Sequence, residues 1–380
     1  EKLNPAQERI AQGTGSQVFT RNNITYRDAF TKLESVNRGT NMIVAACSSL
    51  DYDVKDKLED GTVASIRQKT VLKLLNTKAN PFQSIQTFRT NIFTDFVLEG
   101  NIFMYWDGAH LYHLPAANMQ IQTDEKTLVK GYLYNGTVAF KPEDVLHIQD
   151  LSSITIYRGS SRLEAANRSI KTLYSMQIFQ DQFFENGATP GIVLETDNTL
   201  SQTAKTRLLT WWKQMYSPKN GARAPMIIDN GLHVKSIHEV SFKELDFDTS
   251  INTHDTKILK ALGVPPILLD GGNNANISPN LRLFYLETIM PIVRKFVSAI
   301  ERHFGYDVEA ITSSVSALQP DLKDISSYHV SLVNGGIITP NEARAELRYE
   351  DLADLDKIRV PANIAGSAVN PDTGGAPKKE

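Results

Sequence analysis

The chain has 380 residues, and its 40 Lys and Arg residues nearly balance its 43 Asp and Glu residues, for a net charge of −3. This balance argues against tight, sequence-independent binding of nucleic acid, which rests on many Lys and Arg contacts to phosphate, although it does not exclude a protein that nucleic acid passes by. A hydrophobic content of 41% is enough for a core, and the length suggests two or three core units.

Several functional classes find no support in the sequence. Cys47 is the single cysteine, so neither a disulfide framework nor a zinc knuckle is expected. No run of about 18 apolar residues predicts a membrane span, and the polar opening residues predict no signal peptide. A P-loop motif is missing, which argues against a self-contained ATP motor.

The first part of the chain predicts a flexible N-terminal arm followed by a compact α+β unit. Residues 1–26 are polar and weakly periodic. Apolar spacing then predicts helices over 28–49, 70–76 and 82–96. Hairpin turns at Asp107-Gly108 and Asn135-Gly136 separate short strands expected over 100–106, 111–114, 119–123, 129–134, 137–140 and 145–148.

A small βαββ insertion is expected between two helices. The first helix is predicted from Ser160 to Asn186, with Ser161 and Glu164 as a capping box. Strands over 191–195, 224–228 and 232–237 and a helix over 201–216 form the insertion. The second helix is predicted over about 246–262.

The stretch from Ile258 to Pro291 reads as helix, break, loop and helix. Pro265-Pro266 ends the first helix, and Ser278 with Pro279 is expected to begin the next one. Between positions 264 and 280 the only charged residue is Asp270.

The C-terminal part predicts a kinked helix, a strand pair and a second helical unit. Pro291 should kink or split the helix over 281–304. A strand pair is expected over 306–311 and 315–318, then a helix over 324–334. Thr339 is expected to cap a helix that starts at Pro340, and the tail from 362 onward is expected to be disordered.

Histidines and carboxylates offer only weak signs of chemistry. His110 and His113 are expected on opposite faces of a hairpin, which disfavours a metal pair. His147 on a strand is interpreted as a satisfied core histidine rather than a base. Asp246 and Asp248 suit a solvated helix start, with a general acid and base pair as the alternative.

Four stretches, in order, resemble one family: the portal proteins of tailed bacteriophages, of the type shared by long-tailed lambdoid phages. The stretches are LLNTKANPFQSIQTFRTNIFTDFVLEGNIFMYW (74–106), GSSRLEAANRSIKTLYSMQIFQDQFFENGATPGIVLE (159–195), ILKALGVPPILL (258–269) and LVNGGIITPNEARAELRYEDL (332–352). Their order and spacing cover most of residues 28–355.

The resemblance implies an α+β portal-type subunit that assembles into a ring, usually a dodecamer. Its expected parts are an arm (1–26), an α/β wing (27–159), paired stem helices (160–187 and 244–263) around a βαββ clip (188–243), a tunnel loop (264–280), a wing return helix with strands (281–323), a helical crown (324–361) and a disordered tail (362–380).

The resemblance also implies a structural role without catalytic residues, metal or cofactor. Double-stranded DNA would pass through the ring at a unique capsid vertex during packaging and ejection. Expected partners are further copies of the chain, the major capsid protein, the terminase large subunit and the head-completion or adaptor protein, with no membrane involved. The protein would reside in the virion after assembly in the bacterial host cytoplasm.

Three groups of residues are the resulting site candidates. The tunnel loop would contain Asp270, Gly271, Gly272, Asn273, Asn274, Ala275, Asn276 and Ile277, the last as its apolar constriction. Stem residues expected at subunit interfaces are Tyr174, Met176, Phe183 and Phe184, with completion of the monomer's own core as the alternative. Trp211 and Trp212 are the candidates for partner docking on the clip, or core residues at helical spacing.

Two other functions stay open from the residues alone. One is a soluble α+β enzyme that uses Asp246, Asp248 and His254. The other is a monomeric interaction module such as a capsid adaptor. A ring with a central hole would favour the portal over both.

Overall fold

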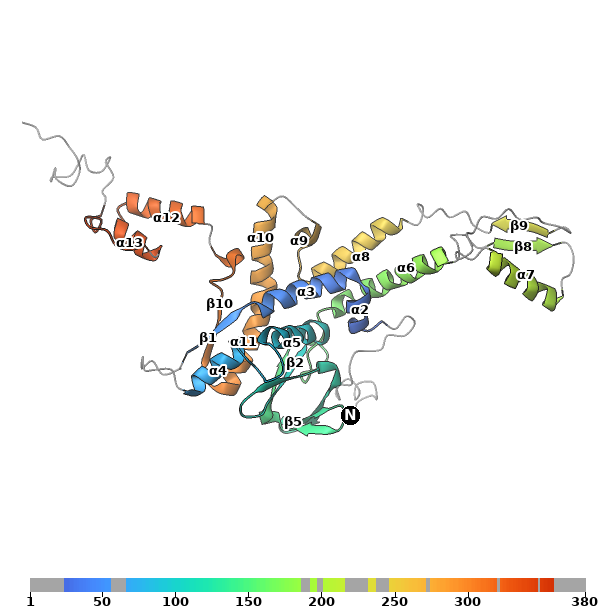
Figure 1. Cartoon of the computed structure of the whole chain (residues 1–380), viewed down its shortest axis with the longest axis horizontal. Helices are drawn as coiled ribbons and strands as arrows, with labels where there is room; N and C mark the ends of the chain where they lie inside the picture. The colour runs from blue at the N-terminus through green and yellow to red at the C-terminus, as the bar shows by residue number, and fades with distance from the viewer. Residues whose placement is uncertain are drawn as a thin grey trace, which may run out of the picture. The chain divides into compact units, whose positions relative to one another are not determined.

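The computed structural model in Figure 1 describes residues 24–55, 66–185, 192–196, 201–215, 232–236, 246–270, 274–319, 322–347 and 349–358. The chain divides into two compact units, residues 1–314 and 315–380. No helix among the described residues is long and apolar enough to cross a membrane. The expectations for the arm (1–26) and the tail (362–380) fall almost entirely outside the described residues.

Helices form the first part of the larger unit, as predicted. They are α2 (Tyr26–Lys32), α3 (Glu34–Ser48), α4 (Ile66–Asn76) and α5 (Ile85–Glu99). Thr25 begins α2 with a capping box in which its side chain and that of Asp28 each accept a hydrogen bond from the other's backbone. Gly100 ends α5 at a φ of 70°, which glycine adopts without steric cost.

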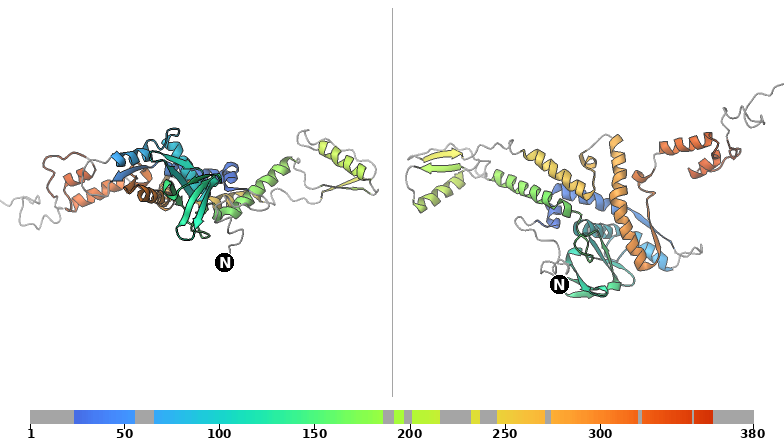
Figure 2. Two further views of the ribbon diagram at one scale, coloured as in Figure 1. Left: turned by 90° about the horizontal axis from the view of Figure 1, so that it is seen from below. Right: turned by 180° about the vertical axis from the view of Figure 1, so that it is seen from behind.

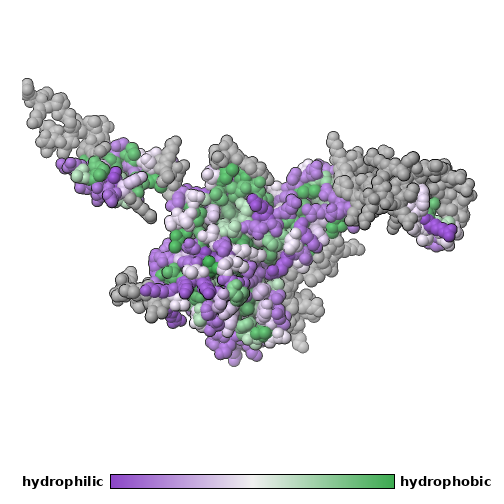
Figure 3. All heavy atoms as spheres, in the orientation of Figure 1, coloured by the Kyte–Doolittle hydropathy of each residue, from purple (hydrophilic) through white to green (hydrophobic). Residues whose placement is uncertain are grey.

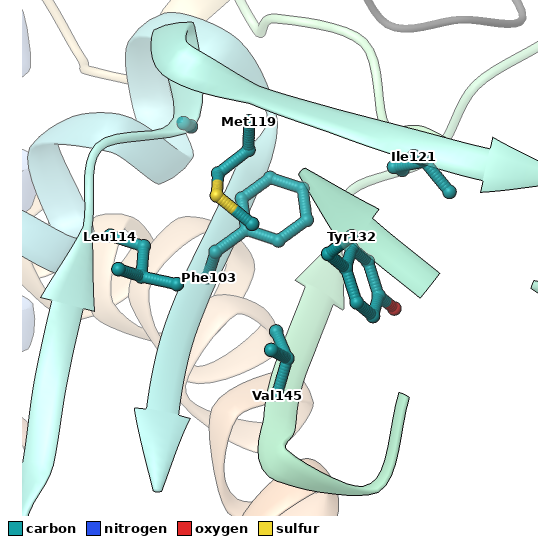
Figure 4. Packing of buried hydrophobic residues seen from close by; sticks show 7 residues of the cluster. Phe103, Leu114, Met119, Ile121, Tyr132 and Val145 are labelled. Carbon is teal, nitrogen blue, oxygen red and sulfur yellow. The ribbon is translucent and has the colours of Figure 1, made fainter. Parts of the chain in front are cut away.

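Two three-stranded antiparallel sheets pack around one apolar cluster. The sheets are β3-β2-β7 and β4-β5-β6, with strands β2 (Asn101–Trp106), β3 (Leu111–Leu114), β4 (Met119–Asp124), β5 (Leu128–Tyr134), β6 (Val138–Phe140) and β7 (Val145–Gln149). Figure 4 shows the cluster from close by: Phe103, Leu114, Ala116, Met119, Ile121, Tyr132 and Val145. The predicted α+β character of this region is confirmed.

The predicted strand pair over 306–311 and 315–318 is wrong. Strand β10 (Asp307–Ile311) instead pairs antiparallel with β1 (Asp51–Lys55), while residues Ser316–Leu318 form a 3₁₀ turn. Burial explains the choice, because Tyr52, Val54 and Val308 are buried and the ring of Tyr52 packs against that of Phe296. A period of two marks a strand but does not identify its partner.

The two helices around the insertion lie side by side in Figures 1 and 2. They are α6 (Asn167–Glu185) and α8 (Phe247–Leu262). The expected start of the first helix at Ser160 is wrong: Ser161 donates its hydroxyl to the Val97 carbonyl (3.2 Å) and accepts from the Leu163 amide. The predicted capping box is therefore not formed, and α6 is roughly 28 Å long at 1.5 Å per residue.

The insertion contains β8 (Ile192–Thr196), α7 (Gln202–Met215) and β9 (Leu232–Ser236), and the two strands pair antiparallel. The strand expected over 224–228 lies outside the described residues. In the smaller unit, α12 (Leu322–Asn334) precedes α13 (Pro340–Glu346). Thr339 caps α13 with a full capping box, as the sequence predicted.

Candidate functional site

The candidate site is the segment that follows α8 and leads into the next long helical stretch of the chain, over residues 274–304. It contains the single turn α9 (Ile267–Asp270) and the start of α10 (Asn274–Phe284). Residues 271–273, three of the predicted loop positions, lie outside the described residues. The part of the loop expectation that covers Asn274–Ile277 is wrong in conformation, because these residues already belong to α10.

The predicted helix start at Ser278 and Pro279 is also wrong, since Pro279 lies inside α10. A proline in the second turn of a helix removes a single backbone hydrogen bond, here the one to the carbonyl of Ala275. The helix tolerates this loss near its beginning. The result is a shorter non-helical stretch than the sequence indicated.

The base of this segment is closed by one hydrogen bond between its two ends. Gly263 ends α8 at a φ of 78°, and the Val264 amide returns to the Leu259 carbonyl (2.9 Å), as in a Schellman motif. The hydroxyl of Thr288 donates to the carbonyl of Gly263 over 2.7 Å. Thr288 is only 4% exposed, so water does not compete for this bond.

The packing at this closure leaves no room for a larger residue. A Cβ atom added to Gly263 would lie 2.5 Å from the Thr288 hydroxyl oxygen. Glycine is therefore required here for two reasons, the left-handed backbone and the close approach. The residues between Gly263 and Thr288 therefore leave and return to the same place in the fold, because the hydrogen bond between these two residues joins the ends of the segment.

Thr288 itself lies in a π-helical turn, Tyr285–Ile289, between α10 and α11 (Met290–Phe304). Pro291 lacks an amide and cannot continue the regular hydrogen-bond pattern toward the preceding turn. The predicted effect of Pro291 is seen only in the hydrogen-bond pattern: five π-helical residues precede it, and the backbone stays helical from 281 to 304. Single π-helical turns within α-helices occur frequently at functional sites.

An acidic side chain beside this base, Asp150, pairs with two cations. Arg162 and Lys260 line a cavity of about 240 Å³ next to Gly263. The Nε atom of Arg162 lies 2.8 Å from an oxygen of Asp150, and Lys295 contacts the other oxygen. Burial by itself would raise the pKa of Asp150, but the two cations hold it below its usual value.

The described stem candidates make contacts within the chain. The hydroxyl of Tyr174 accepts a hydrogen bond from Lys32 (3.3 Å). The sulfur of Met176 accepts one from Ser250 on α8 (3.8 Å). Both side chains are half-buried, and the side chains of Phe183 and Phe184 lie outside the described part. Their role at a subunit interface stays a prediction.

Trp211 on α7 is 42% exposed, which leaves its ring available to a partner. The side chain of Trp212 lies outside the described part of the chain. Docking through these two residues therefore also stays a prediction.

A buried charge cluster escaped the sequence reasoning. Asp95 on α5 accepts hydrogen bonds from Arg27 (2.6 Å), from the ring of His113 (2.8 Å) and from the Ala116 amide (2.7 Å). Burial by itself would raise the pKa of Asp95, and these partners lower it below its usual value. The cluster joins α2, α5 and the sheet, so we assign it a structural role.

His147 is the satisfied core histidine that was predicted. Its ring stacks on Phe103, and its Nε2 atom lies 3.1 Å from the side-chain oxygen of Asn101. Burial, assisted by Arg158 and Arg302, lowers the pKa of His147 to about 3, so the ring is neutral at pH 7.

The alternative enzymatic residues do not converge. Asp248 is exposed in the first turn of α8, and Asp246 precedes that helix at a φ of 43°. His254 lies six residues after Asp248, which places it roughly 9 Å along the helix and on another face. Among the described residues, no group of three His, Cys, Asp or Glu side chains could hold a metal ion.

Comparison with known proteins gives one consistent result. The family model described as phage portal protein matches residues 34–347. The portal protein of Escherichia phage T5 is 39% identical over 394 aligned positions, which cover 100% of this chain and 96% of that protein. A probable portal protein of Streptomyces phage phiC31 is 27% identical over 61% of this chain and 53% of its own length.

Solved structures agree in fold. A chain in the neck of an empty gene transfer agent particle, computed with C6 symmetry, has a TM-score of 0.62 at 19% identity, covering 90% of this chain and 98% of the other. An HK97 family phage portal protein from Corynebacterium diphtheriae has a TM-score of 0.56 at 17% identity, covering 80% and 99%. The chain belongs to the phage portal protein family.

Proposed function

We propose that the protein forms the ring-shaped channel at a unique capsid vertex through which double-stranded DNA enters and later leaves. The observation that carries this proposal is the portal family match across residues 34–347. The fold supports it, because α8, which packs beside α6, leads directly to a segment whose base is closed by the Gly263–Thr288 hydrogen bond. We infer a structural role without catalysis.

The chemistry of the segment between Val264 and Asn280 fits contact with moving DNA. Its one charged residue is Asp270, and Gly271 to Asn276 carry small or amide side chains. A ring of Lys or Arg side chains would release counterions at every subunit and would hold the DNA in place. An uncharged segment touches the phosphate backbone without such capture.

The Gly263–Thr288 closure supports this assignment. It holds Gly263 and Thr288 together, so the base from which the segment starts and to which it returns is fixed. Rigid support of a contacting segment is what a channel lining needs. We infer that residues 264–280 line the channel.

The partners follow from the same proposal. The ring would contain twelve copies and would contact the major capsid protein. Residues 188–243, with Trp211 exposed on α7, would dock the terminase large subunit and then the head-completion protein. The assembled protein would reside in the virion, after assembly in the cytoplasm of the bacterial host.

Two experiments test the proposal. Electron microscopy of the purified full chain should show rings with a central hole wide enough for a duplex, and a strict monomer at every concentration would contradict it.

In a packaging assay, Asn274→Lys should shorten the packaged DNA more than Asn274→Ser. A cation in the first helical turn costs α10 only about 0.3–1 kcal/mol, so the variant should still fold. Equal packaged lengths would contradict the argument about capture.

A further inference from the structure

A groove between β7 and α11 is lined by two arginines that form no ion pair with any other described residue. It has a volume of about 370 Å³. The described residues that line it are His147, Ile148, Gln149, Arg294, Lys295, Ser298, Ala299 and Arg302. None of these is acidic, although the whole chain has more acidic than basic residues.

The arginines and the lysine of this groove differ in their partners. Lys295 contacts Asp150, a carboxylate that it shares with Arg162. Arg294 and Arg302 are exposed, and neither forms an ion pair with another residue of the described ranges. His147 adds no charge, because its ring is neutral at pH 7. The two guanidinium groups therefore supply the positive charge of the groove that faces no acidic partner, and Lys295 adds a charge that Asp150 only partly offsets.

The spacing of these groups suits a polyanion. Arg294, Ser298 and Arg302 follow one another at intervals of four residues on α11, so the two arginines lie roughly 12 Å apart along the helix axis. The other face of α11 is fixed in the core through Ile292, Phe296 and Ile300, all at most 2% exposed. The groove thus presents two charges on a rigid support.

We propose that this groove binds phosphate groups of the DNA backbone. Arginine is suited to phosphate, because its planar fork can donate two parallel hydrogen bonds. Ser298 and Gln149 add neutral polar groups beside the two charges. Interfaces with DNA are polar and positively charged, as this groove is.

A protein partner fits the groove less well. Only Ile148 and Ala299 contribute apolar side chains, whereas the buried centre of a protein interface is largely apolar. The groove also has the opposite chemistry to the segment over 264–280. Unpaired arginines would capture DNA, so the groove suits DNA that is held at rest rather than DNA in transit. This distinction rests on the proposed portal function.

The test is the affinity of the full-length assembled protein for a mixed-sequence duplex about one helical turn long, followed by fluorescence anisotropy at several salt concentrations. The double variant R294Q/R302Q removes both charges. Each lost phosphate contact lowers the slope of log K against log salt by about 0.9. Two contacts should therefore flatten the slope by about 1.8 and weaken binding roughly 60-fold at 0.1 M salt.

K126Q/K130Q is the matched control, because it removes two charges from the exposed β4–β5 hairpin. Its affinity should stay close to that of the unmodified protein. Equal losses of DNA affinity in both double variants would show a general effect of net charge and would contradict the proposal that the groove binds DNA. R294K/R302K keeps the charge without the fork, so its salt slope should be preserved while its affinity falls modestly.

A different result would assign the groove to contacts between copies of the chain. If R294Q/R302Q lowers the native mass of the assembly and leaves DNA affinity unchanged, the proposal is wrong. Failure of the groove would leave ring formation and the packaging defect of Asn274→Lys intact. The two proposals can therefore fail independently.

Discussion

The closure between Gly263 and Thr288 gives a quantitative prediction for Gly263→Ala. Alanine at a φ of 78° costs about 1–2 kcal/mol, because its Cβ crowds the following carbonyl. The same Cβ would lie 2.5 Å from the Thr288 hydroxyl oxygen. Displacement of Thr288 would also weaken a buried hydrogen bond with a net contribution of about 1 kcal/mol. We expect a total loss of about 2–3 kcal/mol in unfolding free energy.

Gly305→Ala is the matched control for this prediction. Gly305 ends α11 at a φ of 79°, and a Cβ added there would meet no atom within 4 Å. It should lose only the backbone term of about 1–2 kcal/mol. Urea denaturation of both variants, followed by circular dichroism, isolates the contact with Thr288 as the difference between them.

A double-mutant cycle with Thr288→Ala sharpens the test. Removal of the hydroxyl and methyl groups of Thr288 creates space for the new Cβ of Gly263→Ala. The double variant should therefore be more stable than the sum of the single losses implies, by about 1 kcal/mol. Losses that add within about 0.3 kcal/mol would refute the contact argument, as would equal losses for Gly263→Ala and Gly305→Ala.

Two further predictions concern the core of the larger unit. Burial by itself would raise the pKa of Asp95, but its hydrogen bonds outweigh burial and hold this pKa below its usual value. The ionised Asp95 therefore stabilises the fold above the pKa of the unfolded state, and this stabilisation is lost as the pH falls through the pKa of the folded state. Asp95→Asn should cost about 3 kcal/mol, the low end for a broken buried pair because Arg27 is 41% exposed. It should also weaken the dependence of the melting temperature on pH below about 4, the ordinary pKa of an aspartate; an unchanged acid profile would contradict this. Gly100→Ala should prevent folding, because its Cβ would lie 2.2 Å from the backbone oxygen of Ser160. Gly136 has nearly the same φ, but a Cβ added there would meet no atom within 4 Å, so Gly136→Ala should express as soluble protein. Similar yields of soluble protein from the two variants would contradict this argument.

Local features could be predicted from the sequence wherever neighbouring residues satisfy one another. The Thr339 capping box forms as expected because its two partners are three residues apart. Asn135 and Gly136 adopt positive φ angles of 52° and 71°, as their hairpin turn requires. The π-helical turn before Pro291 follows from its missing amide, which no tertiary contact can restore.

Similar local signals failed at Ser161 and Pro279. The Ser161 hydroxyl accepts from the Leu163 amide and donates to the Val97 carbonyl, but the helix α6 begins only at Asn167. The proline signal at Pro279 was overridden, because α10 extends back to Asn274. In each case a sequence pattern described what a residue can do rather than which partner it has.

The sequence by itself determined the family, the order of most helices and strands, and the near absence of charge between Val264 and Asn280. Only the tertiary structure paired β1 with β10, gathered Arg27 and His113 on Asp95, and closed Thr288 onto Gly263. It also placed Arg294 and Arg302 in one groove. The physical reason is that capping, turns and helical periodicity act over a few residues, whereas burial and charge pairing depend on which distant surfaces meet.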